Sequence, residues 1–195
     1  MLNKVLSIKS SFENDPFDNA SLTQLKYYAG TLQTSKYLAA AKIFVNEKLL
    51  KLPADSLIKW DAITFEKNRK QRERITDPRI NSPAVLATFR RTSTLKHLNN
   101  LNEIARNFYE QASNSKDLQS AIAWSDNIIQ MASADEEFYR NYLPGFVDTN
   151  VRLYYKAGDK ETAINKLQNL IRYSKNISTM EYITLLNKMK ANEAI

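Results

Sequence analysis

The sequence predicts an all-α protein made of stacked antiparallel helical hairpins, and three observations support this fold class. The 195-residue chain has only 3 glycines and 5 prolines, too few for the frequent turns of an all-β fold. No segment of strand length shows the alternation of β-branched and polar side chains that a half-buried strand needs. The third observation is a helix-turn-helix pattern within residues 153–164.

This pattern reads Leu-Tyr-Tyr-Lys-Ala-Gly-Asp-Lys-Glu-Thr-Ala-Ile. Gly158 suits the left-handed backbone conformation that ends one helix, and Asp159 suits the cap of the next. Ala163 is small enough to let the two helices touch. The order of glycine, cap and small residue is typical of a tetratricopeptide-like repeat, whose unit is about 34 residues long. We therefore predict a degenerate, right-handed array of such hairpins.

The N-terminal helices are expected near residues 3–12 and over 20–32 and 35–51. In the third of these, apolar residues recur at three- and four-residue spacings and form one buried face. Pro53 follows this helix and cannot continue it.

Two helices are expected next, over residues 55–73 and 83–91. Pro83 suits the first position of its helix, because the backbone N–H that proline lacks would have no partner there. The prolines at 78 and 83 interrupt the repeat pattern, so this part of the chain is expected to be an irregular connection.

The C-terminal half is expected to contain five helices, and small residues mark where its hairpins cross. Ala121 and Ala163 occupy equivalent positions on second helices. Pro144-Gly145 should kink or split the third of the five helices. The expected ranges are 95–112, 117–132, 135–156, 159–174 and 178–191.

Several helix starts carry a serine followed three residues later by Glu or Gln, a pair whose side chains satisfy each other's free backbone N–H groups. These pairs are Ser21 with Gln24, Ser133 with Glu136, and Ser178 with Glu181. The predicted organisation is one all-helical domain, 1–195. It comprises N-terminal helices and a first hairpin over 1–52, a basic connection over 53–94, and repeat-like hairpins with a C-terminal helix over 95–195.

Charge is concentrated in residues 67–91, which hold eight basic residues against Glu73 and Asp77, a net charge of +6. The formal charge of the whole chain is +7, so the other residues carry only +1. The candidates for partner binding are Lys67, Arg69, Lys70, Arg72 and Arg74. A solvated helix end, an acidic protein or lipid surface, and nucleic acid are the alternatives for this segment. No interleaved aromatic residues are expected to form a base-stacking platform, which disfavours nucleic acid.

Catalytic and metal-binding patterns are not found in the sequence. There is no cysteine, which excludes a disulfide, a thiolate nucleophile and a Cys-ligated metal. The single histidine, His97, is expected to be a surface or partly packed residue. The acidic run Asp135-Glu136-Glu137 is expected to complement the start of a helix rather than to catalyse. We predict no catalytic, cofactor-binding or metal site.

The first residues lack the apolar core of a signal peptide, and no run approaches the ~18 apolar residues of a membrane span. The expected structural residues are Ala121, Trp124, Tyr155, Gly158, Asp159 and Ala163. Of the aromatic residues, Trp124 is the one most expected to be buried, because it follows the small crossing residue Ala121 by three positions.

An ordered series extends this pattern: Phe108-Tyr109-Glu110, Leu118, Ala121, Trp124, Asp148-Thr149, Leu153, Tyr155, Lys156, Gly158 and Ala163. This series resembles the C-terminal tetratricopeptide-like helical region of bacterial envelope thioredoxin-family proteins, most clearly over residues 95–175. The thioredoxin domain and its Cys-x-x-Cys motif are absent, so dithiol exchange is not carried over. The resemblance implies a region that binds or spaces partners, in the periplasm or cell envelope.

These observations lead to a prediction of function. We expect a non-catalytic helical scaffold for protein–protein interaction, which binds a protein or peptide and is part of, or derived from, an envelope thioredoxin-like protein. The alternative is binding of nucleic acid or an acidic surface through residues 67–91. An enzyme with an unrecognised site is the third hypothesis.

Overall fold

Helices make up all the regular secondary structure in the described residues, which confirms the predicted all-α class. The computed structural model describes residues 19–75, 77, 79, 82–173 and 180–195. The helix predicted near 3–12 and the cap predicted at Ser178 lie outside these residues. The chain divides into two compact units, residues 1–60 and 61–195. A single domain over the whole chain stays a prediction.

The described part of the first unit holds α2 (Asn19–Gly30), α3 (Thr34–Phe44), the π-helical turn η1 (Val45–Leu49) and the start of α4 (Ala54–Arg72). The helix predicted as continuous over 35–51 therefore widens in its last turn, where the N–H of Leu50 bonds to the carbonyl of Val45 at 2.9 Å. Most of the buried apolar residues of this unit follow the predicted spacing: Tyr37, Ala41, Phe44, Val45 and Leu49.

A leucine in the left-handed conformation joins α2 to α3. Leu32 has φ 55, and the N–H of Gln33 bonds to the carbonyl of Tyr28 at 2.9 Å, as in a Schellman turn. The Cβ of a leucine makes this conformation cost about 1–2 kcal/mol. The cap predicted at Ser21 is wrong, because Ser21 lies inside α2.

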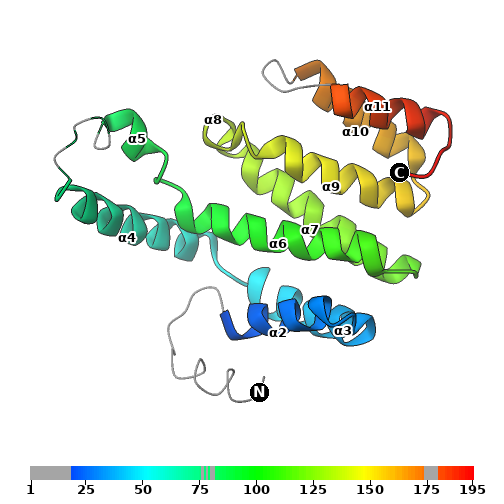
Figure 1. Ribbon diagram of the computed structural model, residues 1–195, viewed down its shortest axis with the longest axis horizontal. Helices are drawn as coiled ribbons and strands as arrows, with labels where there is room; N and C mark the ends of the chain where they lie inside the picture. The colour runs from blue at the N-terminus through cyan, green and yellow to red at the C-terminus, as the bar shows by residue number, and fades with distance from the viewer. Residues whose placement is uncertain (1–18, 76, 78, 80–81, 174–179) are drawn as a thin grey trace. The chain divides into compact units, whose positions relative to one another are not determined.

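The second unit continues α4 and adds α5 (Pro83–Ala87), α6 (Thr92–Gln111), α7 (Ser115–Ser133), α8 (Glu136–Tyr139), α9 (Leu143–Lys156), α10 (Lys160–Tyr173) and α11 (Met180–Lys190). Helix α6 packs against α7, and α9 packs against α10. Helix α9 also contacts α6 and α7, and α10 contacts α11. In Figure 1, α6, α9 and α11 run in one direction and α7 and α10 in the other.

The turn between α9 and α10 has the geometry that the sequence predicted. Gly158 has φ +95. The N–H of Asp159 bonds to the carbonyl of Tyr154 at 3.0 Å, and that of Gly158 to Tyr155 at 3.1 Å, which are the two bonds of a Schellman turn. Asp159 then caps α10, accepting the N–H of Thr162 at 3.1 Å.

Small and aromatic side chains fill the contact between helices of the second unit. Ala121 and Ala163 are fully buried. Trp124 is 2% exposed, and its ring meets that of Phe108 edge-on with centroids 4.9 Å apart. Tyr155 and Ala163 belong to one apolar cluster that also includes residues of α11. Helices α9, α10 and α11 therefore share a core.

The helix predicted over 135–156 is split, as expected, but the break lies just before Pro144-Gly145. The chain splits at residues 140–142, before Pro144-Gly145, into α8 and α9. Pro144 lies in the first turn of α9, where its missing N–H costs no hydrogen bond. The cap predicted at Ser133 is also wrong, because Ser133 is the last residue of α7 and Asp135 occupies the cap position of α8.

Candidate functional site

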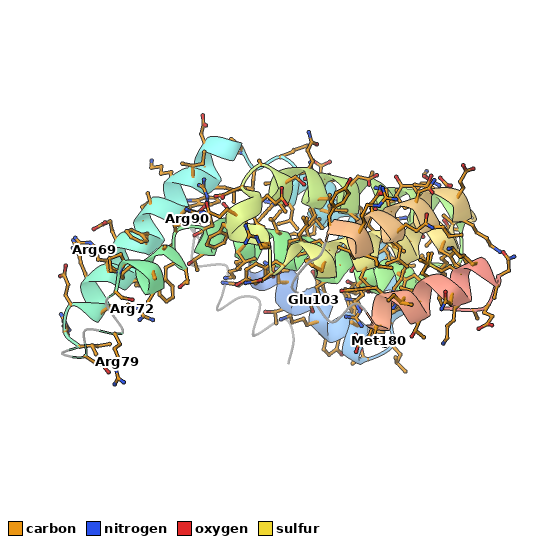
Figure 2. The ribbon with its side chains drawn as sticks, turned by 90° about the horizontal axis from the view of Figure 1, so that it is seen from above. Arg69, Arg72, Arg79, Arg90, Glu103 and Met180 are labelled. Carbon is orange, nitrogen blue, oxygen red and sulfur yellow. The ribbon has the colours of Figure 1, made fainter. Side chains whose placement is uncertain are left out.

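Carboxylates neutralise most of the arginines in the basic segment, residues 67–91. Arg69 Nη2 lies 2.9 Å from Glu66 Oε2, and Arg69 also pairs with Glu73. The hydrogen bond with Arg69 lowers the pKa of Glu66, and the same bond raises the pKa of Arg69. Arg79 pairs with Asp77 at 2.7 Å. Figure 2 shows Arg69 and Arg79 with Arg72 and Arg90 around α4 and α5.

Two further arginines of this segment bind Asp135, from a distant part of the sequence. Arg90 and Arg91 each place a nitrogen 3.1 Å from a carboxylate oxygen of Asp135. Asp135 holds the cap position of α8, but its side chain accepts no backbone N–H there. The acidic run therefore stands at the start of a helix as predicted, with Glu136 and Glu137 in the first turn, but two guanidinium groups bind the Asp135 carboxylate in place of a backbone N–H.

One aromatic ring of the basic segment, that of Phe89, packs against an arginine instead of forming a base-stacking platform. The guanidinium carbon of Arg72 lies 4.3 Å from the centroid of the Phe89 ring, a cation–π contact. Because the two residues are far apart in sequence, the pairing is visible only in the folded chain. Arg72 therefore stabilises the α4 to α5 connection and is a weaker candidate for partner binding.

Lys67 and Lys70 differ from these arginines. No ion pair with either is found in the part of the chain that the structure describes. They line a shallow surface hollow together with Ala62, Ile63 and Glu66, on consecutive turns of α4. Ile63 is 57% exposed. Of the predicted partner-binding candidates, these two lysines line a surface hollow beside an exposed apolar side chain, and Arg74 is exposed as well.

A buried carboxylate on α4 caps the start of α6. Asp61 is 2% exposed and accepts the backbone N–H groups of Ser93 at 2.8 Å and Thr94 at 3.0 Å. It also accepts the hydroxyl of Thr94 at 2.6 Å. The N-cap residue of α6, Arg91, makes no side-chain cap bond, so a different helix satisfies the first N–H groups of α6.

Near this end of α6, His97 and Tyr139 are buried polar residues. His97 is 2% exposed, so the expected surface or partly packed position is wrong. Burial lowers the pKa of His97 to about 4, which keeps its imidazole neutral at pH 7. Burial, and next the charge of Asp61, raises the pKa of Tyr139 to about 12. Both groups are neutral under physiological conditions.

A second polar cluster ties α9 to its neighbours. Asp126 of α7 accepts the hydroxyl of Tyr154 at 2.8 Å, the amide of Asn150 at 3.1 Å and the ammonium of Lys166 at 3.1 Å. Burial, and next the hydrogen bond with Asp126, raises the pKa of Tyr154 to about 12. Since its members come from α7, α9 and α10, this cluster stabilises the packing of consecutive hairpins.

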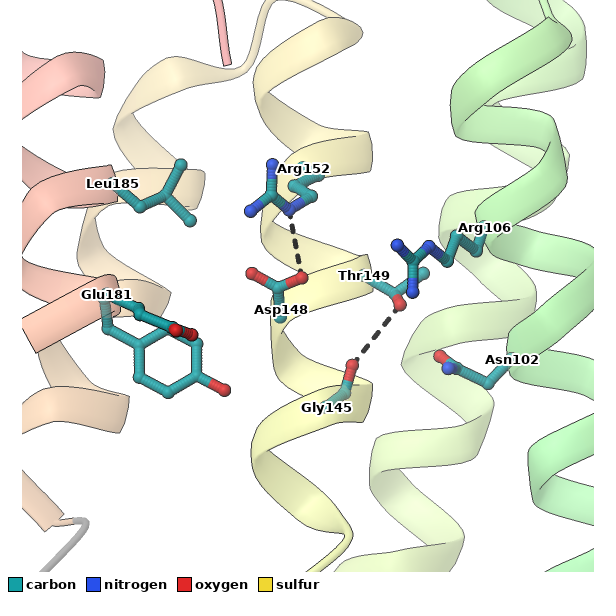
Figure 3. Close-up of a pocket in the computed structure, with 9 residues that line it drawn as sticks. Asn102, Arg106, Gly145, Asp148, Thr149, Arg152, Glu181 and Leu185 are labelled. Carbon is teal, nitrogen blue, oxygen red and sulfur yellow. Dashed lines mark hydrogen bonds and ion pairs between the residues drawn. The ribbon is translucent and has the colours of Figure 1, made fainter. Parts of the chain in front are cut away.

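A polar pocket of about 250 Å³ lies among the three helices that run in the same direction, α6, α9 and α11. We call it the α6–α9–α11 groove. Figure 3 shows side chains from all three helices directed into it. Its lining residues are Asn102, Arg106, Gly145, Asp148, Thr149, Arg152, Glu181, Tyr182 and Leu185.

Positively and negatively charged side chains both line the groove. Arg152 Nε lies 2.9 Å from Asp148 Oδ2, on the same face of α9. Burial lowers the pKa of Arg152, but hydrogen bonds to Asp148 and Tyr109 outweigh burial and leave this pKa above its ordinary value. Arg106 is more open: its side chain is 71% exposed, and its nearest carboxylate, Glu110, is 3.6 Å away.

The lining of the groove also includes a hydrogen-bond acceptor that has no partner in the described part of the chain. The side-chain oxygen of Asn102 is buried and has no hydrogen-bond partner among the described residues. Gly145, on the facing helix, leaves room beside it, because an added Cβ would meet no atom within 4 Å. The groove therefore offers a ligand an exposed guanidinium and unfilled space.

Sequence reasoning missed most of this groove. Asp148 and Thr149 appear in the ordered series above, but Asn102, Arg106 and Arg152 were not singled out. The available signal was spacing, since these residues recur at three- or four-residue intervals on their helices. A solvated helix face has the same spacing, so the pattern alone does not distinguish the two.

The fold and site define an all-helical protein with a mixed-charge groove between parallel helices. Within the described residues, no group of acidic or histidine side chains is placed to hold a metal ion. None of the described helices combines the length and apolar character needed to cross a membrane. No family model, curated protein or solved structure matches the chain.

Proposed function

We propose that this chain is a non-catalytic, tetratricopeptide-like scaffold for protein–protein interaction, and that the α6–α9–α11 groove receives an extended peptide. The observation that carries the proposal is the meeting of three parallel helices at one polar pocket. In arrays of helical hairpins, each unit contacts only its neighbours, and the array presents an extended concave binding surface. The contacts of α9 with α6, α7 and α10 fit this arrangement.

The lining residues match the chemistry of a peptide backbone. An extended peptide presents alternating N–H donors and C=O acceptors. The exposed guanidinium of Arg106 is a donor for the latter, whereas the side-chain oxygen of Asn102 is buried and lies out of a ligand's reach. Asp148 and Arg152 already pair with each other, so they shape the wall of the groove more than they attract a charged ligand.

Selection of random dodecapeptides displayed on phage against the full chain tests the proposal. Gly145→Gln is the blocking variant, because Gly145 lines the pocket and an added Cβ there meets no atom within 4 Å. Gly30→Gln is the matched control, since an added Cβ there also meets nothing within 4 Å. We expect selected peptides to bind the wild type and Gly30→Gln equally and to lose at least tenfold in affinity for Gly145→Gln. Failure to select any peptide that distinguishes the two variants would refute the proposal.

A second candidate function is favoured by Lys67 and Lys70. Two exposed lysines beside Ile63 suit an acidic segment of a partner protein that carries an apolar side chain, whereas a phosphate backbone makes no use of an exposed isoleucine. Fluorescence anisotropy with an acidic peptide and with duplex DNA, at physiological salt, tests this. The Lys67→Ala/Lys70→Ala variant should lose peptide binding, while the matched Lys188→Ala/Lys190→Ala variant retains it. Binding of DNA alone would favour nucleic acid instead.

The resemblance to envelope thioredoxin-family proteins leads to a proposal about location. A helical region of that kind would hold a partner close to a dithiol-exchange domain in the periplasm or cell envelope. Fractionation of the native cells with an antibody to the chain tests this. Recovery in the periplasmic or envelope fraction is expected, and recovery in the cytosolic fraction alone would contradict it.

A further inference from the structure

The turn between α2 and α3 carries a leucine at a position whose backbone conformation favours glycine. Leu32 has φ 55, and the residue that takes this conformation in a Schellman turn is usually glycine. The N–H of Leu32 bonds to the carbonyl of Ala29 at 3.2 Å, and that of Gln33 to the carbonyl of Tyr28 at 2.9 Å. These are backbone bonds, so the leucine side chain is not needed to form them. We call residues 31–33 the α2–α3 turn.

The side chain of Leu32 does not contribute to the core either. It is 88% exposed, and no other large apolar side chain in the described part of the chain is as open. In Schellman turns the apolar residue commonly follows the left-handed one and packs back on the helix. Here that next residue is Gln33, whose amide donates to the hydroxyl of Thr31 at 2.8 Å. Leu32 is therefore strained and exposed at once, and backbone strain of this kind is concentrated at sites that bind a ligand.

The helices on both sides of the turn are positively charged. Residues 19–46 contain three lysines and no Asp or Glu, a net charge of +3. Lys36 is tied to the turn, since its ammonium donates to the side-chain oxygen of Gln33 at 2.8 Å. Lys26 is exposed on α2, and the neighbouring Tyr27 is 44% exposed. The α2–α3 turn therefore presents an aliphatic side chain between two helices that carry only positive charge.

This combination suits a membrane surface better than a pocket on another protein. A bilayer accepts a single aliphatic side chain without any matching shape, its anionic headgroups attract lysines, and tyrosine rings are favoured at the headgroup level. The cores of protein–protein interfaces are instead depleted of lysine, and leucine is under-represented among the residues that dominate binding there. The charge of the turn selects a bilayer that contains anionic lipid.

We propose that the α2–α3 turn is a membrane-contact site, at which Leu32 inserts among the acyl chains of an anionic bilayer while Lys26 and Lys36 bind its headgroups. The glycine that the turn prefers has no side chain to insert, which accounts for a leucine at this position. One aliphatic side chain and two lysines give a weak, reversible attachment. The site belongs to the first unit, so this inference goes beyond the peptide-binding function proposed for the second.

The first test is flotation of the full chain with vesicles of phosphatidylcholine alone and of an equal mixture of phosphatidylcholine and phosphatidylglycerol. Leu32→Gly removes the strain as well as the side chain, so weaker binding of this variant does not come from a less stable fold. We expect it to bind the mixed vesicles about tenfold more weakly than the wild type, the effect of withdrawing one leucine from apolar surroundings. Leu32→Met, which keeps an apolar side chain, should bind like the wild type.

The lysines are tested with the same vesicles. Lys26→Ala and Lys36→Ala should each weaken binding to the mixed vesicles about fivefold. The matched control is Lys188→Ala/Lys190→Ala, which removes two exposed lysines of α11 and should leave binding unchanged.

A second measurement locates the inserted residue. The chain has no cysteine, so Leu32→Cys provides a single site for a dye whose emission shifts to the blue in apolar surroundings. We expect mixed vesicles to shift the emission of this dye. The same dye at Met180→Cys, a position on α11 that is 69% exposed, should not shift.

Three results would each overturn the inference: no binding to the mixed vesicles, equal binding to both kinds of vesicle, or equal binding of the wild type and Leu32→Gly. An absence of vesicle binding would leave a pocket on a partner protein as the ligand of Leu32. The peptides selected against the groove and their sensitivity to Gly145→Gln judge the proposed function separately.

Discussion

The carboxylate of Asp61 is the clearest place to test how the second unit is held together. Asp61→Ala removes three hydrogen bonds at the start of α6, two to backbone N–H groups and one to a hydroxyl. It also removes the nearest buried negative charge from Arg91, 3.9 Å away. The N–H groups of Ser93 and Thr94 would be left at a helix end where Ser93 is only 3% exposed.

The magnitude follows from the bonds that are lost. A helix cap is worth about 0.5–2 kcal/mol, and hydrogen bonds to a charged group about 1.5–3 kcal/mol each, before the cost of burying the carboxylate is subtracted. We therefore expect Asp61→Ala to lower the free energy of unfolding by about 3 kcal/mol. Asp61→Asn keeps one acceptor oxygen and should lose about half as much.

Urea unfolding of the full chain, followed by far-ultraviolet circular dichroism, measures this difference. Asp159→Ala is the matched control, since Asp159 is exposed and accepts a single backbone N–H at 3.1 Å. It should cost about 1 kcal/mol, the usual value for a surface cap. If Asp61→Ala costs no more than Asp159→Ala, the long-range cap does not stabilise α6, and the reasoning is refuted.

Three further predictions concern stability. Gly158→Ala, at φ +95, should lower the free energy of unfolding by about 1–2 kcal/mol. Leu32→Gly, at φ 55, should raise it by roughly 0.5–1 kcal/mol. Urea midpoints that move in the same direction for the two variants would contradict this. Trp124→Ala should cost about 3–5 kcal/mol, a fall in melting temperature of roughly 10 °C, and a shift of one or two degrees would contradict its buried position. Because the pKa of His97 falls from 6.5 to about 4 on folding, the unfolded chain binds more protons, and lowering the pH from 7 to 5 should remove about 2 kcal/mol of stability. His97→Gln should lose this part of the pH dependence, and a variant with unchanged dependence would contradict it.

Helix ends could be predicted where their cause is local. Gly158 and Asp159 end α9 and start α10 through bonds that span only a few residues, so the residue types suffice to predict them. The cap predicted at Ser133 failed because α7 continues to that residue, and the side chain of Asp135 caps no N–H because a distant partner binds it. The carboxylate of Asp135 binds Arg90 and Arg91, more than forty residues away in the sequence, instead of a neighbouring N–H.

The burial of Trp124 was predicted from the sequence, whereas the burial of His97 was missed. A tryptophan beside a small crossing residue gains most by burial, and Trp124 is buried. His97 lies in a polar stretch, so its neighbours in sequence indicated a position at the surface. In the structure it is buried on α6, as are Leu98 and Leu101. The groove was missed for a related reason, because polar residues at helical spacing do not reveal whether another helix faces them.

The sequence by itself determined that this chain forms helices, where several of them end, and which small and aromatic residues let two of them pair. These properties arise from backbone conformation and from hydrogen bonds within about one helical turn. Only the tertiary structure decided which arginines are neutralised, that α4 caps α6, and that α6, α9 and α11 meet at a polar groove. Those outcomes depend on contacts between residues distant in sequence, which exist only after the helices have packed.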